Sequence, residues 1–191
     1  TGNWGTTLAL VLARGGKRVV LVARNETEAA MFSDVGENTR FLPGHRFPAE
    51  LIITADLEQA LQTSVILLAT PSRTVRANAQ TIADYLQPDS VILSCAKGIE
   101  QDSLMLMHEV LTSALVNHPA DRIGALSGPN IANEIANQAP STTVIAVPDE
   151  AAAQRTQALL TTNIFRIYRS ADVIGVELGG ALKNIIALGA G

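Results

Sequence analysis

The chain has 191 residues, of which 47% are hydrophobic and 17% are charged, and its formal net charge at pH 7 is −4. This composition indicates a globular protein with one sizeable core and room for the start of a second domain. A negative net charge without a block of Lys and Arg argues against a general nucleic-acid or anionic-membrane surface, so we expect no nucleic-acid partner. A small anionic ligand can still be held locally.

The first five residues, Thr1-Gly2-Asn3-Trp4-Gly5, precede a helical pattern and match the second half of a dinucleotide-binding turn. In the full G-x-G-x-x-G pattern, the second glycine lets the backbone approach a pyrophosphate and the third packs the helix against its strand. Gly2 and Gly5 have the spacing of these two glycines, whereas the first glycine and its strand would precede Thr1. Because two glycines three apart are common in ordinary turns, the later elements must support this interpretation.

Strand and helix signals alternate along the rest of the chain. Short apolar and β-branched runs predict strands, and helical periodicity predicts the helices between them. The predicted strands cover residues 18–23, 51–53, 64–70, 90–96, 122–127, 142–147 and 164–168. This alternation predicts an α/β fold with a doubly wound, Rossmann-like, mostly parallel sheet that lacks its first strand. We place a dinucleotide-binding domain at residues 1–170 and the first helix of an all-helical substrate domain at residues 171–191.

The single cysteine and the most apolar stretch bear on the protein's environment. Cys95 allows no internal disulfide and lies in a predicted buried strand, which fits an inert thiol in a reducing compartment, so we expect a cytoplasmic protein. Residues 173–191 contain Glu177 and Lys183 near their middle, and we interpret them as a buried helix and not as a membrane span.

Two basic side chains follow predicted strands, where a doubly wound sheet binds its ligands. Arg24 lies nineteen residues after Gly5, where NAD-binding proteins place an acidic residue for the ribose. A guanidinium can pair with a 2′-phosphate, so Arg24 favours NADP(H), and the alternative is a solvated surface arginine. Lys97 ends its strand and is followed at once by Gly98, which directs a cation toward the crevice, although lysines at strand ends are commonly solvated.

Two later positions are candidates for ligand contacts. Gly128 and Asn130 belong to a strand-to-helix turn whose backbone N–H groups suit an anionic or hydroxylated ligand, although such turns are also common without a ligand. Lys183 lies on a helix face with Val176 and Gly180, so it is a lone charge in an apolar, small-residue stripe. Burial readily converts a lysine into a general base, while a snorkelling side chain or a pairing with another part of the protein is the alternative.

Together these stretches resemble the prokaryotic-type NAD(P)-dependent glycerol-3-phosphate dehydrogenases, over essentially all 191 residues. The motifs that carry the resemblance are Gly2-Asn3-Trp4-Gly5-Thr6, Asn38-Thr39-Arg40-Phe41-Leu42-Pro43-Gly44, Ala96-Lys97-Gly98-Ile99-Glu100, Ser127-Gly128-Pro129-Asn130-Ile131-Ala132-Asn133-Glu134 and Val176-Glu177-Leu178-Gly179-Gly180-Ala181-Leu182-Lys183-Asn184. The chain corresponds to the family's cofactor domain and the first helix of its substrate domain, so it is similar to a fragment of such an enzyme. We expect this fragment alone to be inactive.

The resemblance also implies roles for individual residues. Those implied to contact the cofactor, NADP(H) or NAD(H), are Gly2, Asn3, Trp4, Gly5, Arg24, Lys97 and Ala132. Those implied to contact the substrate are Lys97, Gly128, Asn130 and Lys183. Lys183 is the implied proton acceptor in catalysis, with Lys97 beside it, and no metal ion is expected.

The implied reaction is hydride transfer between NAD(P)H and dihydroxyacetone phosphate, a small phosphorylated substrate, giving sn-glycerol 3-phosphate for glycerophospholipid synthesis. A homodimer is a possible form of the full-length protein. Two alternatives remain open, namely a two-domain dehydrogenase that acts on another small oxo or hydroxy acid, and a non-catalytic nucleotide-binding module. The second has no need of Lys183 opposite Lys97.

Overall fold

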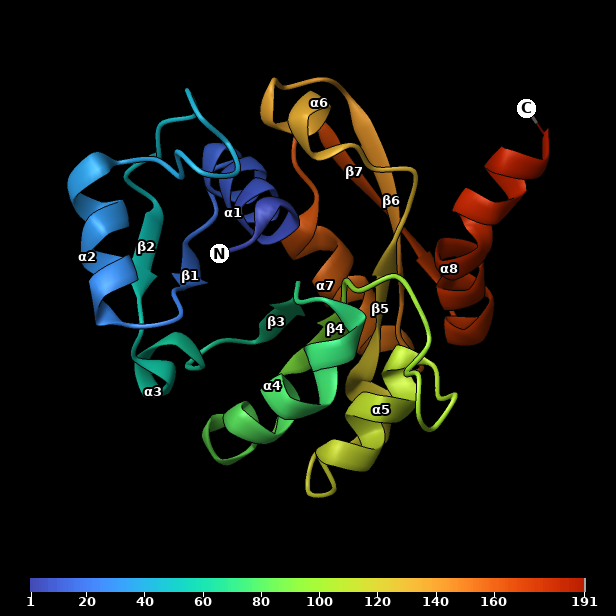
Figure 1. The fold of residues 1–191 in the computed structure, drawn as a ribbon. Helices are drawn as coiled ribbons and strands as arrows, with labels where there is room; N and C mark the ends of the chain where they lie inside the picture. The colour runs from blue at the N-terminus through green and yellow to red at the C-terminus, as the bar shows by residue number, and fades with distance from the viewer. Residues whose placement is uncertain (191) are drawn as a thin grey trace.

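The computed structural model describes residues 1–190, in which helices and strands alternate as the sequence predicts (Figure 1). The first half contains α1 (Asn3–Arg14), β1 (Val19–Val22), α2 (Glu26–Val35), β2 (Leu51–Thr54), α3 (Leu57–Ala60), β3 (Val65–Leu68), α4 (Val75–Ile82) and β4 (Val91–Ser94). The second half contains α5 (Met107–Ala114), β5 (Ile123–Ser127), α6 (Ala132–Ala136), β6 (Ser141–Ala146), α7 (Glu150–Leu160), β7 (Phe165–Ser170) and α8 (Val173–Ala190).

The strands form two sheets. β1 and β2 make a parallel pair, and the other five strands form a sheet in the order β3-β4-β5-β6-β7. Neighbouring strands of the larger sheet are parallel except β5 and β6, which pair antiparallel, with Leu126 opposite Ile145. The prediction of a mostly parallel α/β sheet is therefore confirmed.

β1 and β3 face each other across a gap. A groove of about 790 Å³ runs between them, and it is lined by residues of both strands and by Leu8 and Leu12 of α1. In doubly wound sheets the first strand lies at the centre, next to the strands that follow the first and third helices. The expectation of a sheet without its first strand accounts for this gap.

Helices cover both faces of the larger sheet, as in a doubly wound fold. Side chains alternate across β4, so that Val91, Leu93 and Cys95 join the core cluster under α1 and α7, whereas Ile92 joins the cluster under α4 and α5. A strand that is buried on both faces reads as a continuous apolar run, which is why residues 90–96 gave a clear strand signal. Cys95 is 4% exposed, and burial raises the pKa of its thiol to about 12.

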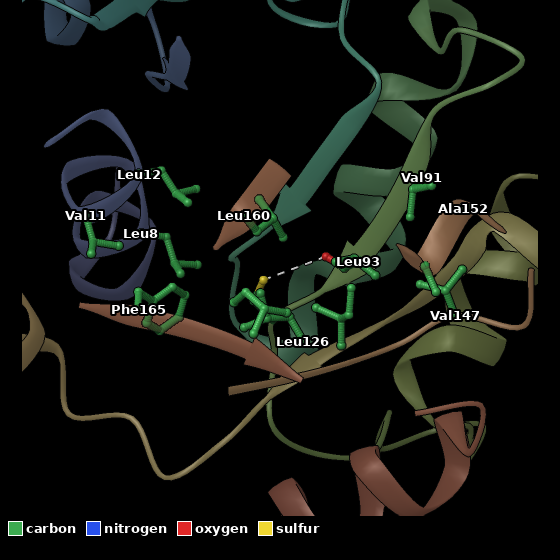
Figure 2. Packing of buried hydrophobic residues seen from close by; sticks show 14 of the residues in the cluster. Leu8, Val11, Leu12, Val91, Leu93, Leu126, Val147, Ala152, Leu160 and Phe165 are labelled. Atoms are coloured by element: carbon green, nitrogen blue, oxygen red, sulfur yellow. Dashed lines mark hydrogen bonds between the residues drawn. The ribbon is translucent and has the colours of Figure 1, made fainter. Parts of the chain in front are cut away.

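Helix α1 joins the two sheets. Its Leu8 and Leu12 point toward Leu160 and Phe165 in the larger core cluster (Figure 2). Ala9 and Ala13 pack instead in a smaller cluster with Leu21 and Leu51 of the β1–β2 pair. One helix thus supplies apolar contacts to both sheets, and its N-terminus lies beside the end of β3.

Local sequence signals set several helix boundaries. Asn25, Asp56 and Asp149 cap α2, α3 and α7 by accepting a backbone N–H from the first turn, at 2.9 to 3.1 Å. Gly36 ends α2 in the left-handed region, with φ of 71°, where a glycine carries no steric penalty.

Helix α8 begins directly after β7 and stands beside β5 and β6, with its far end projecting away from the sheet (Figure 1). Its first turns pack through Val173 and Val176 against Ala125 and Ala146. Farther along, Ile185, Ile186 and Leu188 are exposed. The division into domains at residues 170 and 171 stays a prediction, and Gly191 lies outside the described residues. Within residues 1–190, no helix combines the length and the apolarity that crossing a bilayer requires.

Candidate active site

A pocket of about 260 Å³ lies where α8 crosses the end of β5. Ser127, Gly128 and Pro129 line it from the β5 side, and Val144 lines it from β6. The α8 residues that line it are Gly175, Val176, Gly179, Gly180 and Lys183. The face that the sequence predicted for Val176, Gly180 and Lys183 is therefore the face that α8 turns toward the sheet.

Gly180 lets α8 approach the sheet closely. A Cβ atom at this position would stand 2.4 Å from Oγ of Ser127 and 3.7 Å from Cγ of Lys97. A side chain here is excluded unless Ser127 changes its rotamer, because real Cβ atoms do not approach an oxygen so closely. The small residue therefore brings Lys183, one turn farther along α8, to the same edge as Lys97.

Lys97 and Lys183 meet at this edge. The amine of Lys97 donates a hydrogen bond to the carbonyl oxygen of Gly128 at 3.2 Å. Desolvation of this amine, followed by the hydrogen bond and the charge of Lys183, lowers the pKa of Lys97 to about 8, although the side chain as a whole stays open to solvent. No carboxylate among the described side chains lies within 4 Å of either amine. Two cations without an acidic partner suit an anionic ligand.

The N-terminus of α1 lies at the end of β3. Gly2 is the N-cap residue and provides no side-chain cap for the first turn, and nothing lies within 4 Å of a Cβ built on it. A Cβ at Gly5 would stand 3.4 Å from Cβ of Ala69, so Gly5 allows the helix to pack tightly against the segment after β3. An uncapped helix N-terminus that faces open space suits a pyrophosphate. Asn3 and Trp4 form the first turn, and the ring of Trp4 packs on the core cluster under α1.

Arg24 follows β1, and its side chain is 70% exposed but not free. Its Nη2 and Nε donate to Oε1 of Glu28 at 2.6 and 2.9 Å, and its backbone N–H donates to Oε2 at 2.7 Å. Burial opposes ionisation of Glu28, but the hydrogen bonds from Arg24 and Thr1 outweigh it and lower the pKa of Glu28 to about 2. The sequence did not indicate this partner, because Arg24 precedes the N-cap residue of α2 and Glu28 lies inside the helix.

The remaining predicted contacts lie on the turn between β5 and α6. Gly128 lines the pocket, whereas the Asn130 amide donates to the carbonyl oxygen of Thr142 at 2.9 Å and braces the turn against β6. Ala132 begins α6 and does not line the pocket. The structure thus brings Lys97, Gly128 and Lys183 together, while Arg24 lies with Glu28 beside the smaller sheet. Their roles stay predictions.

A second polar pair, buried between two helices, was also not predicted from the sequence. Glu177 of α8 is 3% exposed and lies 2.6 Å from Nδ1 of His108 at the start of α5. Glu177 was visible as an acidic residue in an apolar helix, but nothing in the sequence connected it with a histidine 69 positions earlier. Only the fold brings the two together.

The sheet, the glycine turn at α1 and the polar residues that follow the strand ends are those of a dinucleotide-binding α/β protein of the Rossmann type. A family model described as the N-terminus of NAD-dependent glycerol-3-phosphate dehydrogenase matches residues 1–153. The chain belongs to this family of NAD(P)-dependent oxidoreductases, as the sequence motifs predicted.

Similar proteins agree with this assignment. The chain is 43% identical to glycerol-3-phosphate dehydrogenase [NAD(P)+] of Streptomyces griseus and 42% identical to that of Corynebacterium glutamicum, over its whole length. Among solved structures, it superposes on glycerol-3-phosphate dehydrogenase of Coxiella burnetii with a TM-score of 0.87 and 33% identity, over 98% of this chain and 57% of that one. The chain spans 57% of the length of the two curated relatives.

Proposed function

We propose that this chain is the cofactor-binding part of a glycerol-3-phosphate dehydrogenase that interconverts dihydroxyacetone phosphate and sn-glycerol 3-phosphate. The observation that carries the proposal is the meeting of Lys97 and Lys183 beside a pocket that Lys183 lines and whose other lining residues are small or apolar. A non-catalytic nucleotide-binding module would gain nothing from two unneutralised lysines that oppose each other, since the hydrogen bond and charge of Lys183 lower the pKa of Lys97.

The residues present fit a nicotinamide dinucleotide. The uncapped first turn of α1 and the open space beside Gly2 suit its pyrophosphate, and Arg24, held by Glu28, suits a 2′-phosphate. Asn3, Trp4 and Ala132 are proposed to complete the contacts, with Lys97 between cofactor and substrate. The preference for NADP(H) over NAD(H) rests on Arg24 alone.

The bound cofactor supplies the hydride that passes between its nicotinamide and C2 of the substrate. The protein's own residues bind, orient and protonate. Lys183 exchanges the proton of the C2 hydroxyl, and Lys97 holds the oxygenated end of the substrate and stabilises the developing alkoxide. Gly128 and Asn130 are proposed to complete the substrate contacts. Because the pKa of Lys97 is about 8, its amine is mostly charged at neutral pH.

The product suits glycerophospholipid synthesis, since sn-glycerol 3-phosphate is the backbone onto which such lipids are built. We further propose that the full-length protein acts in the cytoplasm and forms a homodimer. The support for a cytoplasmic location is the single cysteine, which forms no internal disulfide and so does not depend on an oxidising compartment. Its thiol is buried and its pKa is raised, which makes it a poor nucleophile.

The test uses these 191 residues joined at both ends to the remaining segments of the Streptomyces griseus relative, hereafter the completed chain. Lys183→Met keeps the length and apolar packing of the side chain but removes its amine. General acid–base catalysis contributes roughly 100- to 10,000-fold, so kcat should fall by about that factor while NADPH binding survives. Lys97→Met should weaken substrate and cofactor binding together with the rate, because it also removes ground-state contacts.

Lys17, the only other lysine of the sequence, provides the matched control, and Lys17→Met should leave kcat unchanged. The measurements are steady-state oxidation of NADPH with dihydroxyacetone phosphate and titration of NADPH binding. If Lys183→Met changes only KM, Lys183 is a binding residue and another group accepts the proton. Turnover of small oxo acids without turnover of dihydroxyacetone phosphate would reassign the substrate.

A further inference from the structure

A buried carboxylate connects α8 to α5. Oε1 of Glu177 accepts the backbone N–H of His108 at 2.9 Å, and Oε2 lies 2.6 Å from Nδ1 of the same residue. Burial of a carboxylate is costly unless its oxygens are paired, and here both oxygens have a partner on His108. Glu177 is therefore tied to one residue of another helix by two contacts, which fixes direction as well as distance.

The contact also completes the first turn of α5. The N-cap residue of α5 is Leu106, whose side chain has no acceptor for the free N–H groups of that turn. Glu109 accepts the N–H of Leu106 at 2.8 Å, and Glu177 reaches in from α8 to accept the N–H of His108. A negative charge at a helix N-terminus is favoured by the helix dipole. The hydrogen bond to Glu177 also raises the pKa of the His108 ring, while desolvation opposes this rise.

Glu177 is well placed to set the orientation of α8. It lies three residues before Gly180 and six residues before Lys183, on a helix whose apolar anchors are Val173 and Val176 at its start. Apolar contacts are not directional, so they leave a helix free to rotate about its axis. A double hydrogen bond from a buried side chain is directional and restricts that rotation. A small rotation at Glu177 would carry Lys183 away from Lys97.

We propose that Glu177 and His108 are positioning residues, which hold α8 at the rotation that directs Lys183 toward Lys97. The proposal rests on the function proposed above, in which both lysines face one substrate. Neither residue lines the pocket, so in this proposal the pair acts only through the placement of α8. Its loss should therefore lower kcat more than it changes cofactor affinity.

The first experiment compares Glu177→Ala with Glu177→Gln in the completed chain. Displacement of a catalytic group by about 1 Å can cost about 100-fold in rate, so Glu177→Ala should lower kcat at least about tenfold. The dissociation constant of NADPH should stay within about twofold, since the α1 end of the site is untouched. Glu177→Gln should recover most of kcat, because its amide oxygen can accept the His108 N–H and its amide nitrogen can donate to a neutral ring.

The matched control is Val110→Ala, which removes buried apolar atoms from α5 without touching α8. It should lower Tm with little change in kcat. His108→Ala gives a second route if Glu177→Ala fails to fold, because it keeps the backbone hydrogen bond to Glu177 and removes only the ring. A loss of kcat in Val110→Ala as large as in Glu177→Ala would show that general destabilisation, and not positioning, is responsible.

Amide hydrogen exchange gives a readout that does not need turnover. Exchange in residues 173–183 should be faster in Glu177→Ala than in the unaltered completed chain, and Val110→Ala should leave it unchanged. If the unaltered chain does not turn over dihydroxyacetone phosphate, the proposed function fails and the exchange rates alone decide the positioning role. Unchanged exchange, or unchanged kcat in an active chain, would overturn the inference.

Discussion

The titration of Lys97 offers a direct test of its proximity to Lys183. Its pKa of about 8 has desolvation as the largest cause, followed by the hydrogen bond and the charge of Lys183. Lys183→Met removes the second and third causes and leaves the first. Because a close charge commonly moves a pKa by about 1 or more, we expect the pKa of Lys97 to rise by about 1 and to stay below that of a free lysine.

The sign of this change gives a consequence for activity. In the unaltered protein Lys97 loses its charge as the pH rises through about 8, so KM for dihydroxyacetone phosphate should increase above that pH. In Lys183→Met the increase in KM should begin at higher pH, even though kcat is low. A site in which the two amines do not interact would show the same onset in both proteins.

The assay is nuclear magnetic resonance of the completed chain after ¹³C-dimethylation of its lysines. The Lys97 signal is assigned by its loss in Lys97→Arg, and its chemical shift is followed with pH. Lys17→Met should leave this titration unchanged, because Lys17 follows the C-terminal end of α1, whereas Lys97 follows β4. A Lys97 pKa that is the same with and without Lys183 would refute the reasoning, since burial alone would then account for the shift.

Two further predictions concern the cofactor and α8. Arg24→Asp in the completed chain should raise the dissociation constant for NADPH far more than that for NADH, because it replaces attraction by repulsion at the 2′-phosphate. Arg166→Asp on β7 changes the net charge by the same amount and is the control. Equal effects of Arg24→Asp on both cofactors would contradict the proposed preference for NADP(H). Gly180→Ala should lower the free energy of unfolding by about 1 kcal/mol, since the new methyl group meets Ser127, whereas Gly189→Ala in open space should raise it by up to about 1 kcal/mol through helix propensity. Thermal unfolding of both variants checks this. Adding Ser127→Ala to Gly180→Ala should restore the lost stability, and failure to do so would contradict a contact between the new methyl group and the Ser127 hydroxyl.

Local patterns were enough to predict most of the fold. The apolar run at residues 90–96 predicted β4 because that strand is buried on both faces. The caps at Asn25 and Asp149 were not predicted, although both use short polar side chains that commonly begin helices. The antiparallel pairing of β5 with β6 was not predictable in the same way. Strand direction depends on how the chain between Ser127 and Ser141 returns to the sheet, and neither periodicity nor composition records that path.

In the candidate site, too, local sequence patterns predicted some features, whereas others depend on packing. The position of Lys183 on the small-residue face of its helix follows from helical periodicity alone, and the structure places that face on the pocket. The pairing of Glu177 with His108 and of Arg24 with Glu28 depends on distances in space. The second pair is local and follows a four-residue spacing, whereas the first requires α5 and α8 to meet, which only packing determines.

The two sheets of the described residues are held together by side-chain packing and not by strand pairing. Among residues 1–190 no hydrogen-bond ladder joins β1 to β3, and α1 packs against both sheets. A dinucleotide that contacted the N-terminus of α1 and Arg24 would tie the smaller sheet to the larger one from outside. Since any molecule that binds only the assembled form stabilises it, cofactor occupancy and the cohesion of the two halves are expected to rise and fall together. Under the proposed function the cofactor would therefore stabilise the contact between the two sheets as well as supply the hydride.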